Sequence, residues 1–100
     1  MTWNSSNGNS GAYWLEAGPA RVEIDPGAGG RIAALEIAGL SVLVPRTEDR
    51  LRWGCYPMAP WAGRLRDGRF RFADRNYEVP RTMPPHAIHG TTLDRGWASH

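Results

Sequence analysis

The sequence contains no lysine, because all 12 of its basic residues are arginine. The absence of lysine excludes Schiff-base chemistry on a lysine amine and a phosphate-binding loop that depends on lysine. The single cysteine, Cys55, excludes an internal disulfide framework and a cysteine-based zinc cage. We expect Cys55 to be a small buried residue. No apolar run approaches the length of a membrane-spanning helix, so we predict no membrane partner.

The charges nearly balance, with 12 basic and 10 acidic residues and a formal net charge of +2. Acidic residues alternate with the arginines along the chain, which is typical of a solvated surface and argues against a nucleic-acid partner. A chain of 100 residues, with 22% charged and 10% aromatic residues, has the composition of a folded protein. Its length allows one small domain or a part of a larger one.

The first segment, residues 1–11, is polar and rich in Gly, Asn and Ser, and it predicts a disordered leader. It has neither the basic nor the apolar region of a secretory signal peptide. We therefore expect a cytoplasmic protein whose folded part is residues 12–100.

Short apolar runs separated by Gly, Pro, Asn or Asp predict an all-β chain. The expected strands occupy 13–15, 20–24, 31–37 and 41–44. Residues 31–37 also suit a helical turn, because Ile32 and Leu35 are three residues apart. Aromatic and polar residues alternate on both sides of 73–75, which predicts a β-hairpin over 69–79.

Two loops, Gly54–Arg64 and Arg81–Gly90, are apolar but too rich in Pro and Gly to be central strands. Long rigid loops of this kind usually cover or line a site. Arg64 follows Gly63 at the end of the first loop, where its guanidinium could grip vicinal hydroxyls, a carboxylate or a phosphate. A solvated surface arginine is the alternative interpretation. Trp61 either stacks on a sugar ring or fills the core.

The second loop carries His86 and His89, three residues apart. Further metal ligands are not close to them in the sequence, so we predict no metal site. His89 is either a half-buried hydrogen-bonded histidine or an imidazole presented at a loop end to a ligand hydroxyl. Gly90 would allow a neighbouring backbone or ligand to approach closely.

These motifs resemble the aldose 1-epimerases, also called galactose mutarotases. The matching segments are GGRIAALEIAG at 29–39, GCYPMAPWAGRLRDGRFRFADRNYEVP at 54–80 and PPHAIHG at 84–90, in the same order and spacing. AGRLRDGRF and HAIHG are the most specific parts. The resemblance runs from about Gly18 to Trp97.

The resemblance implies an antiparallel β-sandwich of galactose mutarotase-like type, of which residues 12–100 would be an incomplete N-terminal portion. It implies interconversion of the α and β anomers of free hexoses by acid/base ring opening, without a cofactor. Arg64 and His89 match family residues that contact the sugar. The family places Asn before this arginine, whereas Gly63 stands here.

In the family, a second His and a Glu far downstream of the His-Gly motif act as acid and base. The resemblance therefore implies that this chain carries no catalytic residue and supplies a substrate-binding set: Trp61, Gly63, Arg64 and His89. The expected partner is a small-molecule sugar of glucose or galactose type, and the oligomeric state stays open. Two alternatives are a non-catalytic carbohydrate-binding module of the same fold and a hexose-phosphate epimerase that uses the arginine-rich stretch 64–81.

Overall fold

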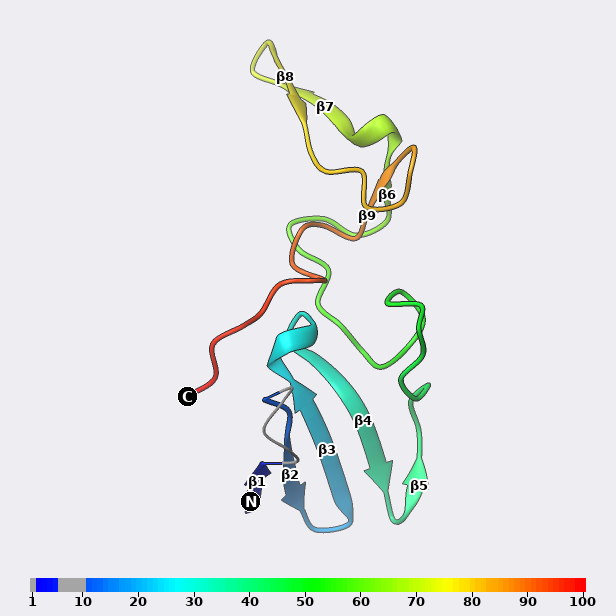
Figure 1. The fold of residues 1–100 in the computed structure, drawn as a ribbon, viewed down its shortest axis with the longest axis vertical. Helices are drawn as coiled ribbons and strands as arrows, with labels where there is room; N and C mark the ends of the chain where they lie inside the picture. Colours follow the sequence, from blue (N-terminus) through cyan, green and yellow to red (C-terminus); the bar gives the residue numbers. More distant parts are fainter. Residues whose placement is uncertain (1, 6–10) are drawn as a thin grey trace. The chain divides into compact units, whose positions relative to one another are not determined.

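A computed structural model describes residues 2–5 and 11–100, with the side chains of 11–100. These residues form short antiparallel strands and two 3-10 turns, which confirms the predicted all-β fold (Figure 1). They divide into two compact units, one made of the chain up to Pro57 together with Asp94–His100, and one made of Met58–Leu93. No helix among the described residues has the length and apolar character that a membrane crossing requires.

The first unit contains an antiparallel sheet in the order β1-β2-β3-β4-β5 (Figure 1). Its strands are β1 (Thr2–Ser5), β2 (Tyr13–Ala17), β3 (Ala20–Asp25), β4 (Arg31–Ile37) and β5 (Leu40–Ser41). Between β3 and β4 lies the 3-10 turn η1 (Pro26–Ala28). The segment 31–37, which suited a strand or a helical turn, is a strand because it pairs along β3, with Leu35 opposite Val22.

Three local expectations differ from the structure in this unit. Within the expected disordered leader, Thr2–Ser5 form β1, with Trp3 opposite Leu15 in β2, while residues 1 and 6–10 lie outside the described residues. The strand expected over 41–44 is wrong beyond Ser41. After Val42 donates to the carbonyl of Leu35, the chain leaves the sheet, and Val44 accepts from Gly54 instead.

Cys55 is exposed, so its expected burial is wrong. Its backbone exchanges two hydrogen bonds with Ile32 of β4, at 2.8 and 2.9 Å. The residue is therefore held to the sheet by its backbone, and this pairing does not require the side chain to point inward.

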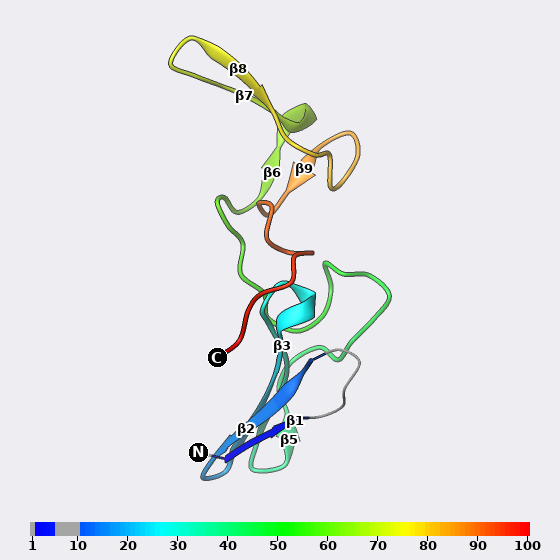
Figure 2. The ribbon, with the colours of Figure 1, turned by 60° about the vertical axis from the view of Figure 1, so that its left-hand side comes forward.

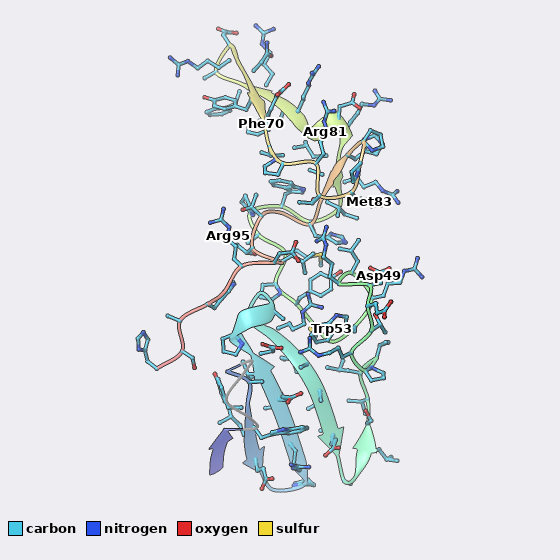
Figure 3. The ribbon with its side chains drawn as sticks, in the orientation of Figure 1. Asp49, Trp53, Phe70, Arg81, Met83 and Arg95 are labelled. Carbon is cyan, nitrogen blue, oxygen red and sulfur yellow. The ribbon has the colours of Figure 1, made fainter. Side chains whose placement is uncertain are left out.

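The centre of the first unit is a buried arginine. Arg31 has 1% of its surface exposed and donates to the carbonyls of Ala28, Arg50 and Trp53 at 2.9, 3.0 and 3.1 Å. Its guanidinium also lies 4.0 Å from the ring centroid of Trp53, which is labelled in Figure 3. Asp25, 2% exposed, pairs with Arg46. This core therefore combines apolar residues with satisfied charged groups.

The second unit contains two small antiparallel ladders, β6 with β9 and β7 with β8 (Figure 2). The elements are β6 (Arg64–Leu65), the 3-10 turn η2 (Arg66–Gly68), β7 (Arg69–Phe72), β8 (Arg75–Glu78) and β9 (Ala87–Ile88). The turn between β7 and β8 places Ala73 and Asp74 at φ values of 50° and 63°. Two positive φ angles match the twist of a tight hairpin, so the predicted hairpin over 69–79 is confirmed.

Candidate ligand-binding site

The two Pro- and Gly-rich loops singled out in the sequence are paired within the second unit. Ala59 forms a parallel bridge with Gly90, and the Thr91 N–H donates to the Ala59 carbonyl at 2.8 Å. Further along, Arg64 lies opposite Ile88 in the β6–β9 ladder. Segments 24 to 32 residues apart in the sequence are thus joined by their backbones, an arrangement that local sequence patterns do not encode.

Gly63 and His89 contact each other at the end of this ladder. The backbone N–H of His89 donates to the Gly63 carbonyl at 2.9 Å, and the backbone N–H of Gly63 donates to Nδ1 of His89 at 3.0 Å. Both residues have positive φ angles, 80° and 57°. The structure therefore brings together three of the four predicted site residues, since Arg64 follows Gly63 directly.

His86 makes a second contact of the same kind. The backbone N–H of Asp67 donates to Nδ1 of His86 at 3.0 Å. His86 also exchanges two backbone hydrogen bonds with Met83, at 2.7 and 2.8 Å, across the Pro84-Pro85 turn. We did not predict this role for His86, because the sequence shows only its spacing from His89 and not its backbone partner.

Arg64 differs from most of the arginines around it. Arg69 pairs with Glu78 at 2.8 Å, Arg71 with Asp74 at 3.5 Å, and Arg81 donates to the Asp67 carbonyl at 3.1 Å. The exposed Arg64 guanidinium makes no hydrogen bond or ion pair with any residue that the structure describes. Its five donors are therefore available to a ligand rich in oxygen atoms.

Trp61, the fourth predicted residue, is half-buried. Its indole Nε1 is buried and has no hydrogen-bond acceptor in the described part of the chain. A buried donor without an acceptor costs about 1–3 kcal/mol, so such atoms call for an explanation.

The site is therefore dominated by hydrogen-bond donors. Arginine and tryptophan side chains donate and cannot accept, which suits ligands that present many lone pairs, such as sugars and phosphates. Within residues 2–5 and 11–100, no three His, Cys, Asp or Glu side chains form a group that could hold a metal ion.

A hollow lies on the β7–β8 hairpin. It has a volume of about 500 Å³ and is lined by Arg69, Phe70, Asn76, Tyr77 and Glu78. The rings of Phe70 and Tyr77 stack with their centroids 5.0 Å apart, and Phe70 is labelled in Figure 3. The predicted alternation placed these rings on one face of the hairpin, but it did not indicate the hollow.

The structure is similar to solved structures of sugar epimerase-like proteins. A putative aldose 1-epimerase from Escherichia coli K12 matches with a TM-score of 0.74 and 24% identity, over 89% of this chain and 32% of that chain. A galactose mutarotase-like protein from Clostridium acetobutylicum matches with a TM-score of 0.69 and 24% identity, over 89% and 30%. Galactose 1-epimerase from Lactobacillus acidophilus NCFM matches with a TM-score of 0.63 and 14% identity, over 93% and 31%.

These matches define the class of fold. The chain has a galactose mutarotase-like antiparallel β-fold and spans about a third of the length of the proteins that share it. The resemblance seen in the sequence is thus confirmed at the level of the fold. No protein-family profile matches the sequence, and no curated protein matches it.

Proposed function

We propose that this chain binds an aldohexose in a protein that interconverts the α and β anomers of free hexoses. The proposed contacts come from Trp61, Gly63, Arg64 and His89. The observation that carries the proposal is the reciprocal bonding of Gly63 and His89 next in the chain to Arg64, whose guanidinium has no partner among the described residues. The shared fold with aldose 1-epimerase-like proteins supports the same reaction class.

Anomer exchange needs two proton transfers. A base removes the proton of the anomeric hydroxyl while an acid protonates the ring oxygen, so that the ring opens. Rotation about the C1–C2 bond and reclosure then give the other anomer. No cofactor is needed, because neither electrons nor groups are transferred.

The side chains of this site suit the holding of the sugar and not the removal of a proton. Arg64 stays protonated and donates in a planar fork, and the Trp61 indole is a donor only. Neither group can act as a base at neutral pH. We therefore propose that these residues orient the sugar, while the acid and the base are other groups of the protein.

One observation favours a hexose phosphate as a second candidate ligand. Arg66 and Arg75, like Arg64, are exposed and have no hydrogen-bond or ion-pair partner within the described residues. Free guanidinium groups also suit a phosphate dianion. We rank the free hexose first, because its binding requires only Arg64 and the paired loops.

A binding experiment separates these possibilities. The ¹⁵N-labelled chain is titrated with D-galactose, D-glucose, D-galactose 6-phosphate and, as a non-sugar control, glycerol. We expect the backbone signals of Gly63, Arg64 and His89 to shift with a free hexose and not with glycerol. Absence of shifts with every sugar would overturn the proposal. An affinity at least about tenfold higher for the phosphate, equivalent to about 1.4 kcal/mol, would favour the second candidate.

Polarimetry of freshly dissolved α-D-galactose then separates binding from catalysis. We expect the chain alone not to accelerate anomer exchange above the buffer rate, since the proposed residues hold the sugar without supplying the base. Clear turnover would place the acid and the base within these residues and overturn this part of the proposal. Binding without catalysis in any longer protein that contains the chain would favour the carbohydrate-binding module.

We also propose a cytoplasmic location, which fractionation of the tagged protein tests.

A further inference from the structure

We infer that the backbone N–H of Gly63 fixes His89 as the Nε2–H tautomer, so that the imidazole nitrogen not bonded to Gly63 carries the hydrogen. Gly63 is then a positioning residue that acts through its backbone. The tautomer itself follows from the protein's own contacts, whereas its use toward a sugar rests on the proposed function.

The tautomer follows from the hydrogen bond at Nδ1. A neutral imidazole carries one N–H and one nitrogen lone pair, and the two nitrogens exchange these roles between tautomers. The Gly63 N–H donates to Nδ1 of His89 at 3.0 Å, so Nδ1 holds the lone pair. The hydrogen of the neutral ring is therefore on Nε2.

The backbone explains why glycine stands at this position. Gly63 has a φ of 80°, in the left-handed region that glycine adopts without steric cost. A Cβ built on Gly63 would meet no atom within 4 Å, so the space around it is open. The requirement is thus for the backbone angle that aims the N–H at the imidazole, and not for a small side chain.

A second hydrogen bond joins the backbones of the same two residues. The His89 N–H donates to the Gly63 carbonyl at 2.9 Å, so the two residues are joined at two points. With both its backbone and its ring attached to the same residue, the His89 side chain has a restricted orientation. A donor held in this way can discriminate between ligand atoms.

The chemical consequence concerns what the ligand must offer at this point. An Nε2–H group pairs with an oxygen lone pair, such as that of a ring oxygen or a hydroxyl group. The other nitrogen of neutral His89 already accepts from Gly63, so the ring has no lone pair left to take a proton from a sugar hydroxyl. His89 is thereby assigned to positioning and excluded as the base in its neutral form.

His86 provides a matched comparison in the same unit. Its Nδ1 accepts from the Asp67 N–H at 3.0 Å, so it too is the Nε2–H tautomer. Because the donor is Asp67, a change at Gly63 should leave the tautomer of His86 unaltered. His100, which is exposed, serves as a reference for an imidazole on the surface.

The test is a measurement of the imidazole nitrogens in the full 100-residue chain. Long-range ¹H–¹⁵N correlation spectra of ¹⁵N-histidine-labelled protein at about pH 8, where histidine is neutral, distinguish the two tautomers. We expect pure Nε2–H patterns for His89 and His86 and a mixture for His100. A pure Nδ1–H pattern or a mixture at His89, with His86 in the expected form, would overturn the inference.

Two substitutions at Gly63 test the cause. Asn tolerates a positive φ, so Gly63→Asn should keep the Nε2–H pattern of His89, whereas β-branched Gly63→Val should move the N–H away and give mixed tautomers. The His86 pattern should stay unchanged in both variants, which shows that the unit is folded. If Gly63→Val unfolds the unit, the Asn variant and the unmodified chain still decide, because loss of the pattern in Gly63→Asn would contradict the inference.

Addition of D-galactose separates this inference from the proposed function. If His89 is the Nε2–H tautomer but no sugar perturbs it, the tautomer assignment stands and the proposed function fails. If the sugar binds while His89 is the Nδ1–H tautomer, the proposed function stands and the inference fails. If both hold, we expect Gly63→Val to weaken galactose binding at least about tenfold and Gly63→Asn to weaken it much less.

Discussion

Gly90 lies so close to Ala59 that no side chain fits between them. A Cβ built on Gly90 would come within 1.9 Å of the Ala59 carbonyl oxygen and 2.3 Å of its carbonyl carbon. The φ of Gly90 is 77°, which also favours glycine. This close approach is what lets the two loops pair through the Thr91 N–H and the Ala59 carbonyl.

We expect Gly90→Ala to separate the loops and destabilise the second unit strongly. Gly63→Ala is the matched control, because Gly63 has a similar φ of 80° but open space around its Cβ. The control should lose about 1–2 kcal/mol of unfolding free energy, because alanine is strained in the left-handed backbone conformation. Gly90→Ala should lose at least about 2 kcal/mol more, because the clash is with backbone atoms. Hydrogen exchange of the Ile88 and Thr91 amides measures this difference, and equal exchange in the two variants would contradict it.

Arg31 should be essential to the first unit, because its guanidinium satisfies three backbone carbonyls. Arg31→Met leaves these carbonyls without a donor and should cost about 1–3 kcal/mol or more in the free energy of unfolding. Arg31→Lys should not restore the loss, since an ammonium cannot reproduce the planar fork. Arg21→Met is the control, because Arg21 is exposed and its pairs with Glu16 and Glu36 should contribute little.

Urea unfolding followed by tryptophan fluorescence measures these variants. A Lys variant as stable as the unmodified chain would show that charge alone is sufficient at position 31.

The pH dependence of stability adds a further check. Burial lowers the pKa of the Arg31 guanidinium, because loss of hydration disfavours the charged form.

For a cation, a lowered folded-state pKa means that burial of the charge costs stability at every pH below that pKa. The cost is relieved only as the pH rises through the lowered pKa toward and beyond the unfolded-state value. We therefore expect the difference in unfolding free energy between the unmodified chain and Arg31→Met to be constant from about pH 5 to pH 9, where arginine is charged in both states. A difference that varies over this range would show that another titrating group depends on Arg31.

The strand pattern was predictable where local signals were sufficient. The hairpin over 69–79 follows from alternating aromatic residues and the turn at Ala73 and Asp74. The segment 31–37 was ambiguous, because its fate depends on pairing with β3, which a local pattern does not report. The strand β1 was missed for the same reason. Its polar sequence gives no local strand signal, and its pairing with β2 is what makes it a strand.

The sequence named candidate site residues, but it did not indicate the contact between two of them. Arg64, Gly63 and His89 were selected from motif and loop composition, whereas the contact of Gly63 with the imidazole joins positions 26 residues apart. The buried Arg31 could not be foreseen, because arginine in a sequence is expected at the surface. Its burial depends on three carbonyls that only the folded chain brings together.

The edge of the sheet in the first unit should cause self-association. Leu40, Val42 and Val44 are 70%, 52% and 56% exposed, along and just beyond the edge strand β5. Apolar side chains on an unpaired edge favour contact with other chains. We expect sedimentation to detect concentration-dependent oligomers, and Leu40→Lys together with Val42→Lys to reduce them. Ser99→Lys adds the same charge at an exposed position near β2 and β3 and should have a smaller effect. An equal effect would mean that net charge alone controls association.

Arg64 should account for much of the affinity for a sugar. Its guanidinium is exposed and has no protein partner among the described residues, so Arg64→Met removes donors without leaving an unpaired acidic group behind. A hydrogen bond to a charged group contributes about 1.5–3 kcal/mol, so we expect the Kd for D-galactose to rise at least about tenfold. The Kd of Arg64→Lys should lie between those of the unmodified chain and Arg64→Met, because the charge remains while the planar fork is lost. Arg66→Met is the matched control, since Arg66 is also exposed and lies two residues further along. Chemical-shift titration measures all three variants. Equal weakening by Arg64→Met and Arg66→Met would mean that the arginines act only through their total charge, and unchanged binding in Arg64→Met would remove Arg64 from the site.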